Sequence, residues 1–203
     1  MIEKEYLDRI IVSVNELRAK VQYKQIDTEC CDVSFMATRK ISFVGYKQGY
    51  SEQLIRSEKG IKETPKVRSN CTYYKRIAKD AQGRLLQIES FARGKIDCLH
   101  QTYWIGNTCY SFPYSPNGSY YPTYSYVTKW KNEKIVEEYM VAKNQIVYEK
   151  YFDETNLKAM YYYINYVHNG MYPVLEEKKG VFKFNPLRFE CIYSDNWLKH
   201  RKT

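Results

Sequence analysis

Turn-forming residues recur at nearly even spacing over the last two-thirds of the chain, and this rhythm constrains the fold more than any other feature. The intervals between them run from 10 to 14 residues. The segments between them, such as residues 84–91 and 145–152, are rich in β-branched and aromatic residues, and several alternate apolar with polar side chains. Short strands with turn signals at this spacing are typical of an antiparallel β-meander, in which consecutive strands pair with their neighbours. The turn residues are Gly83, Gly94, Asn107, Gly118, Asn132, Asn144, Asn156, Gly170 and Gly180.

The sequence therefore predicts a mainly β (α+β) fold, an antiparallel meander of about 8–10 short strands, open or partly closed. Two segments, residues 134–142 and 157–167, fit either a helix or a strand by propensity. We favour strands, because a run such as Tyr161-Tyr162-Tyr163-Ile164 fills a helix poorly.

The N-terminal part of the chain has a different pattern. Residues 3–21 carry apolar side chains at helical spacing, so we expect an amphipathic helix packed on the sheet. After it, residues 33–36 and 41–44 fit strands, and residues 51–58 fit a short helix. We expect this N-terminal region, residues 1–70, and the hairpin sheet, residues 71–203, to form one compact domain.

Part of the meander resembles the MORN-variant repeats, which alternate a turn glycine with short strands. The unit with the best match runs through Asp80-Ala81-Gln82-Gly83-Arg84-Leu85 and then Ile88-Glu89-Ser90-Phe91-Ala92-Arg93-Gly94-Lys95. Residues 131–139 echo the pattern and residues 153–162 do so more loosely, so the resemblance covers about residues 72–168, with Asn at several positions where the family has Gly. It implies an extended, twisted hairpin sheet used for binding, and many bacterial members are antitoxin-like or immunity-like proteins. The family has no catalytic residues to transfer.

The chain shows no signal for export or for a membrane. It contains no 18-residue apolar run, and its first residues are charged instead of forming the apolar core of a signal peptide. We therefore expect a cytoplasmic protein whose six cysteines are free thiols. The adjacent pair Cys30-Cys31 leaves a redox or metal site as the alternative, although neighbouring strand side chains point to opposite faces. We predict no cofactor and no metal.

No catalytic motif is recognisable. The three histidines, His100, His168 and His200, have no metal-binding spacing, and no phosphate-binding glycine loop or nucleophile elbow is present. The acidic pair Glu137-Glu138 fits two solvated positions on a strand. One enzyme class survives this search, a metal-independent ribonuclease that uses His100 and His168 as acid and base.

Residues 98–128 contain no Asp, Glu, Lys or Arg but many aromatic and small polar residues. This composition is typical of binding surfaces. It also fits the most buried hairpin of the sheet, or a platform that stacks RNA bases. Three prolines, Pro113, Pro116 and Pro122, place part of the segment in a loop or at an edge.

The chain carries a net charge of +9, and seven Lys and Arg lie between residues 59 and 79 against Glu63 alone. This stretch is either a solvated face or a surface that steers an acidic partner. Our leading prediction is a non-enzymatic protein-binding module, most concretely a bacterial immunity protein or antitoxin that neutralises a cognate toxin by direct binding. The charge counts against this version unless the toxin is acidic, and RNA binding or cleavage is the alternative. The predicted partner-binding residues are Tyr103, Trp104, Tyr110, Tyr114, Tyr120, Tyr121, Tyr124, Lys75, Arg76 and Lys79.

Overall fold

The structure of the protein is a computed structural model, and its description covers most of the chain up to residue 194. Beyond residue 150 the description is limited to the backbone. The described ranges are 4–27, 29, 31–38, 48, 56, 61–67, 69–121, 123–143, 145–155, 158–167, 174–184 and 189–194.

These residues form one helix, α1 (Lys4–Lys20), and a 12-stranded antiparallel sheet. From β3 to β12 each strand pairs with the next one in the chain, as the even spacing of turns predicts. The two strands nearest the N-terminus extend the same sheet, because β1 pairs with β3 and β2 lies at the edge. The strands are β1 (Asp32–Ala37), β2 (Glu63–Thr64), β3 (Tyr73–Lys79), β4 (Leu85–Ala92), β5 (Lys95–Ile105), β6 (Thr108–Tyr114), β7 (Ser125–Lys131), β8 (Lys134–Val141), β9 (Gln145–Thr155), β10 (Lys158–Val167), β11 (Val174–Phe184) and β12 (Phe189–Ser194).

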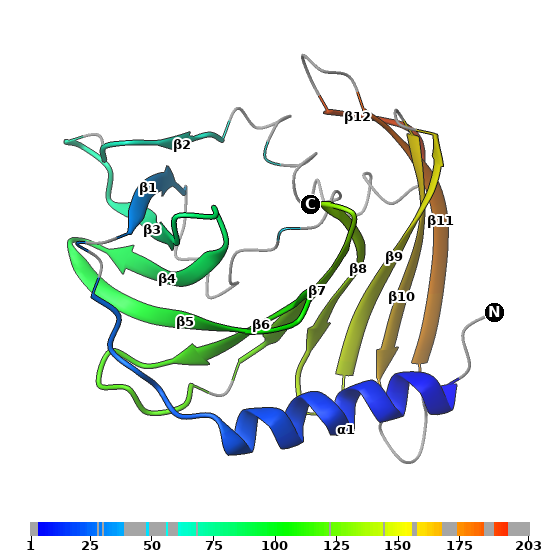
Figure 1. The fold of residues 1–203 in the computed structure, drawn as a ribbon, viewed down its shortest axis with the longest axis horizontal. Coiled ribbons are helices and arrows are strands. Elements are labelled where there is room, and N and C mark those ends of the chain that lie inside the picture. The colour runs from blue at the N-terminus through cyan, green and yellow to red at the C-terminus, as the bar shows by residue number, and fades with distance from the viewer. Residues whose placement is uncertain are drawn as a thin grey trace.

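The sheet is strongly curled but open, with β12 and β2 as its two edges (Figure 1). The helix lies across one side of the sheet, and β1 to β4 lie at the far end from it (Figure 1). The predicted meander, its open form and the packed N-terminal helix are therefore confirmed. No helix in the described ranges is long and apolar enough to cross a lipid bilayer.

Most predicted local elements are confirmed where the structure describes them. The two ambiguous segments are strands, β8 and β10, and the strand predicted at residues 33–36 is β1. The strand predicted at 41–44 lies outside the described residues, as does the helix predicted at 51–58 except for Arg56.

The turn positions follow from backbone conformation. Gly83, Gly94 and Asn132 adopt positive φ angles of 76°, 76° and 49° between consecutive strands, which Gly and Asn tolerate best. Gly180, predicted as a turn, is instead inside β11, where it pairs with both Tyr161 and Ser194. The β11–β12 register shifts directly after the next residue, where Ile192 of β12 is skipped, so this glycine lies within a strand close to a bulge and not at a corner.

The core lies between α1 and one face of the sheet, here called the helix face. On α1, the buried residues Leu7, Ile10 and Val14 follow the helical period, so they form one stripe toward the sheet. The stripe packs on residues from five neighbouring strands, β5 to β9. These strand residues are Leu99, Phe112, Tyr114, Val127, Tyr139, Val141, Ile146 and Tyr148.

The opposite face of the sheet, here called the far face, is also buried: it carries a smaller apolar cluster around Ile77 and Ile88 and, on other strands, buried polar groups. Glu138 and Glu149 lie opposite each other there, and each is 1% exposed. The expectation that Glu137 and Glu138 are solvated is therefore wrong, although the two side chains diverge as expected. Glu138 accepts hydrogen bonds from the Gln48 backbone N–H at 2.7 Å and from the Thr128 hydroxyl at 3.2 Å. Glu137 pairs with Lys129 at 2.8 Å on the helix face. These partners explain how the carboxylates of Glu138 and Glu137 are accommodated inside the fold.

Candidate binding face

The aromatic segment around residues 98–128 packs largely inward, against the N-terminal part of the chain. Tyr114 is 4% exposed and lies in the core, and Tyr103 and Tyr110 pack against the same cluster. The Tyr103 hydroxyl donates to the backbone carbonyl of Gln22 at 2.7 Å and lies 3.1 Å from the Tyr114 hydroxyl. Burial first, and then the Tyr114 contact, raise the pKa of Tyr103 above its usual range. Of the three interpretations of this segment, namely a binding surface, a buried hairpin and an RNA-stacking platform, the buried hairpin fits Tyr103, Tyr110 and Tyr114.

The loop between β6 and β7 holds the end of the helix. The Tyr120 hydroxyl accepts a hydrogen bond from the Arg18 guanidinium at 2.8 Å, and this cation lies 4.5 Å from the Tyr120 ring centroid. Tyr121 and Tyr124 are half-buried, and Tyr124 donates to the Gln145 side chain at 3.3 Å. The tyrosines of this loop therefore serve largely to fix the fold, and Tyr120, at 40% exposure, is the most accessible of them.

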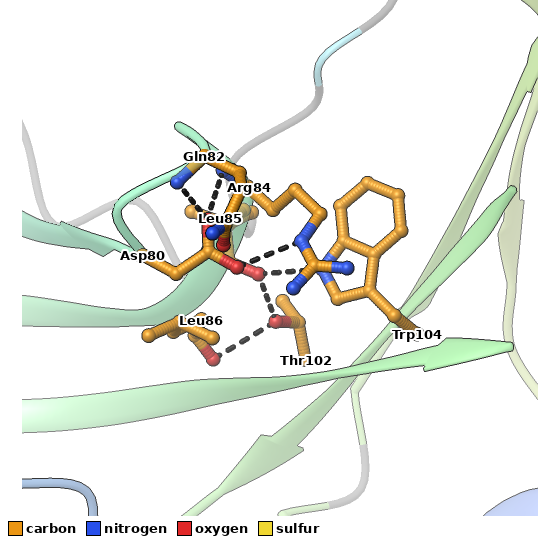
Figure 2. A network of polar contacts seen from close by, with 7 residues as sticks. All are labelled: Asp80, Gln82, Arg84, Leu85, Leu86, Thr102 and Trp104. Atoms are coloured by element: carbon orange, nitrogen blue, oxygen red, sulfur yellow. Dashed lines mark hydrogen bonds and ion pairs between the residues drawn. The ribbon is translucent and has the colours of Figure 1, made fainter. Parts of the chain in front are cut away.

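Trp104 lies at another part of the sheet, beside the β3–β4 turn (Figure 2). Its indole N–H donates to the backbone carbonyl of Leu85 at 2.9 Å, and the Arg84 guanidinium lies 5.9 Å from its ring centroid. Asp80 holds Arg84 through an ion pair of 2.7 Å, and Figure 2 shows this turn folded back toward the tryptophan. Burial favours the neutral form of Asp80, but the hydrogen bonds from Arg84 and Gln82 outweigh it and lower the pKa of this carboxyl.

The predicted basic residues do not form a free cationic strip. Lys75 is 4% exposed on the far face, because its strand position points it into the fold and away from a partner. Arg76 donates to Glu89 at 2.8 Å, and Lys79 donates to Glu63 at 2.9 Å. Cross-strand and edge-strand carboxylates thus neutralise much of this charge.

His100 is unsuited to acid–base chemistry on a polymer. It is 1% exposed, and neither ring nitrogen has a hydrogen-bond partner within the described structure. Burial, and then the charge of Lys75, lower its pKa to about 3, so the imidazole stays neutral. His168, its predicted partner in a ribonuclease site, lies outside the described residues.

The described cysteines are free thiols: Cys31, Cys71, Cys98 and Cys109. Burial raises the pKa of Cys98 to about 11 and that of Cys109 to about 12, so both remain protonated at neutral pH and are poor nucleophiles. No group of three metal-binding side chains occurs in the part of the chain that the structure describes.

One end of the helix face carries a row of aromatic rings, here called the aromatic row (Phe35, Tyr74 and Phe91), on β1, β3 and β4. All three side chains are half-buried. Tyr74 stacks on Phe91 with ring centroids 4.6 Å apart and an interplanar angle of 8°, and it meets Phe35 edge-on at 6.2 Å. Ile96 of β5, 36% exposed, lies directly opposite Phe91 and continues the row. None of these residues belongs to the cluster that packs on α1.

A hollow of about 260 Å³ opens beside the aromatic row. Phe35 and Tyr74 form one part of its wall, and the segment around β2 forms another, with Ile61 and Val67. Two exposed lysines, Lys62 and Lys66, line the hollow as well. At the tip of the β4–β5 hairpin, next to Phe91 in sequence, the exposed side chains of Arg93 and Lys95 add further positive charge.

Sequence reasoning missed this arrangement. The three rings are far apart in the chain, and only the register of β1, β3 and β4 brings them together. The available signal was the alternation within each predicted strand, which places Phe35, Tyr74 and Phe91 on one face once the pairing is known.

Comparisons of the chain with protein-family models, curated proteins and solved structures found no match. The likeness to the MORN-variant repeats therefore stays a prediction.

Proposed function

We propose that this chain is a non-enzymatic protein-binding module that engages its partner through the aromatic row. The most concrete version is an immunity protein or antitoxin that covers and neutralises a cognate toxin. The observation that carries the proposal is a set of half-exposed rings beside a hollow, on the part of the helix face that α1 does not pack against. Aromatic side chains next to a pocket are the usual centre of a protein interface.

The ring geometry favours a protein over a nucleic acid. Binding single-stranded RNA by stacking needs free aromatic faces for the bases. Tyr74 and Phe91 cover one face of each other, and Phe35 lies against Tyr74 as well. A partner would meet mainly ring edges and aliphatic surface, to which an apolar side chain inserted in the hollow is better suited than a base.

The charges around the row indicate what the partner presents. Lys62 and Lys66 line the hollow, and Arg93 and Lys95 lie at the neighbouring hairpin tip. A partner with an apolar centre and carboxylates around it would complement this face, and the charges would accelerate its association. An acidic toxin surface also agrees with the net charge of +9.

A toxin-neutralisation assay tests this proposal. The chain is co-expressed with the product of the adjacent gene, if that product is toxic, and growth is measured. Ile96→Ser, next to Phe91, should reduce protection. Ile105→Ser is a matched control, because Ile105 is an exposed isoleucine, 56% accessible, at the opposite end of the same strand. Equal protection by both variants, at equal protein levels, would refute the aromatic row as the binding face.

A further inference from the structure

A second hollow lies on the helix face between α1 and the strands β6 to β8, which are in the middle of the strand order. Its volume is about 470 Å³, which is within the range of small-molecule sites. One wall is the flank of α1 and the other is the sheet. The lining residues that matter for its chemistry are Arg9, Ile10, Leu17, Tyr110, Lys129 and Tyr139.

The apolar part of this groove follows from the helical period. Ile10, Val14 and Leu17 lie three to four positions apart, so they line one side of α1 along the groove. Tyr110 and Tyr139 face them from the sheet. An elongated apolar group could therefore lie between helix and sheet in contact with both walls.

The charged part of the groove is dominated by cations. Lys129, Glu137 and Lys150 lie directly opposite one another on β7, β8 and β9. The Lys129 ammonium group contacts Glu137 at 2.8 Å and lies 5.5 Å from the Tyr139 ring centroid. Burial alone would lower the pKa of Lys129, but the contact with Glu137 outweighs it and raises this pKa, so the lysine remains charged. Arg9 from the helix lines the same groove, so its charged lining residues are two cations, one of which, Lys129, is paired with Glu137.

We propose that this groove binds a small amphipathic carboxylate, with the acid group at Arg9 and Lys129 and the apolar body along Ile10 and Leu17. The surplus of positive charge selects an anion, and charge-assisted hydrogen bonds to a carboxylate are stronger than those to a neutral group. The apolar walls select a ligand with a hydrocarbon or aryl body over a small inorganic anion. This inference does not depend on the aromatic row, which lies on other strands.

Calorimetric titration of the full chain with phenylbutyrate and with phenylbutanol tests the proposal, because the two probes share the apolar body and differ in the charged group. Phenylbutyrate should bind about tenfold more tightly than the alcohol. Arg9→Gln changes an exposed position and leaves the Lys129–Glu137 pair intact. This variant should bind phenylbutyrate about tenfold more weakly and bind the alcohol with unchanged affinity. Lys131→Gln, an exposed lysine at the end of β7, is the matched control and should change neither affinity.

Leu17→Trp places a larger side chain in the groove and should abolish binding of both probes. The proposal is overturned if neither probe binds, if acid and alcohol bind equally, if Arg9→Gln leaves phenylbutyrate binding unchanged, or if Leu17→Trp blocks neither. Circular dichroism of each variant confirms that the fold is retained.

Discussion

Tyr74 and Phe91 stack ring on ring across the β3–β4 pair, with centroids 4.6 Å apart and planes within 8° of parallel. The pair lies half-exposed on the helix face, outside the cluster that packs on α1. It forms the middle of the aromatic row, and α1 does not pack on this part of the sheet. For this reason we assign the pair to recognition.

The stacked pair should show measurable coupling. In a double-mutant cycle with Tyr74→Leu and Phe91→Leu, urea unfolding should give an interaction energy of about 1 kcal/mol, the usual range for aromatic pairs. Additive effects of the two substitutions would show that the rings do not interact in solution.

Some residues of the aromatic segment lie in the core, and substituting them should lower the free energy of unfolding. Phe112 is fully buried, so Phe112→Ala should lower the free energy of unfolding by about 3–5 kcal/mol in a denaturant titration. Ile105→Ser, at the exposed last residue of β5 in the same hairpin, should stay within about 0.5 kcal/mol of the wild type. Similar effects at both sites would contradict the burial pattern of this hairpin.

Gly118 has two reasons to be glycine. Its φ is +82°, and a Cβ atom would lie 2.9 Å from Cδ1 of Tyr23, whose ring packs on Tyr114. Gly94 has a similar φ of +76° but open space around its Cα. Both Gly→Ala variants should lose about 1 kcal/mol from backbone strain, and Gly118→Ala should lose more because Tyr23 must move. Equal losses in thermal unfolding would show that the loop absorbs the extra methyl group.

His100 should make stability depend on pH. Its folded-state pKa of about 3 lies below the ordinary value of 6.5, so the unfolded chain binds this proton more readily. The stability that the neutral His100 contributes is fully present above pH 6.5 and falls as the pH drops toward 3. Between pH 7 and pH 5 the loss from this group is about 2 kcal/mol.

The variant His100→Leu isolates this contribution. Denaturant titrations at the two pH values should show a smaller loss in the variant than in the wild type, by about 2 kcal/mol. An identical pH dependence in both proteins would mean that His100 takes up its proton without unfolding.

Local patterns predicted the elements of this fold, but not what each face contacts. The period of the turns specifies a meander, and Gly and Asn at Gly83, Gly94 and Asn132 fit their positive φ angles. Gly180 shows the limit of this reasoning, since a glycine inside a strand has the same sequence signal as one at a turn.

The site was harder to predict than the fold. The uncharged aromatic segment has the composition of an interface, yet Tyr103 and Tyr114 contact the chain's own N-terminal region. Likewise, a cluster of basic residues along one strand does not reveal its carboxylate partners: Glu89 of β4 pairs with Arg76, and Glu63 of the edge strand β2 pairs with Lys79. Such partners depend on long-range register, which a single sequence does not specify.

The most direct test of the binding account is the dissociation constant of the partner protein recovered with the wild-type chain, measured again for Phe91→Ser and for Ile105→Ser. Loss of a central aromatic contact should weaken binding by about 30-fold for Phe91→Ser, whereas Ile105→Ser should match the wild type. Unchanged affinity for Phe91→Ser, in a variant that remains folded, would contradict recognition through the aromatic row.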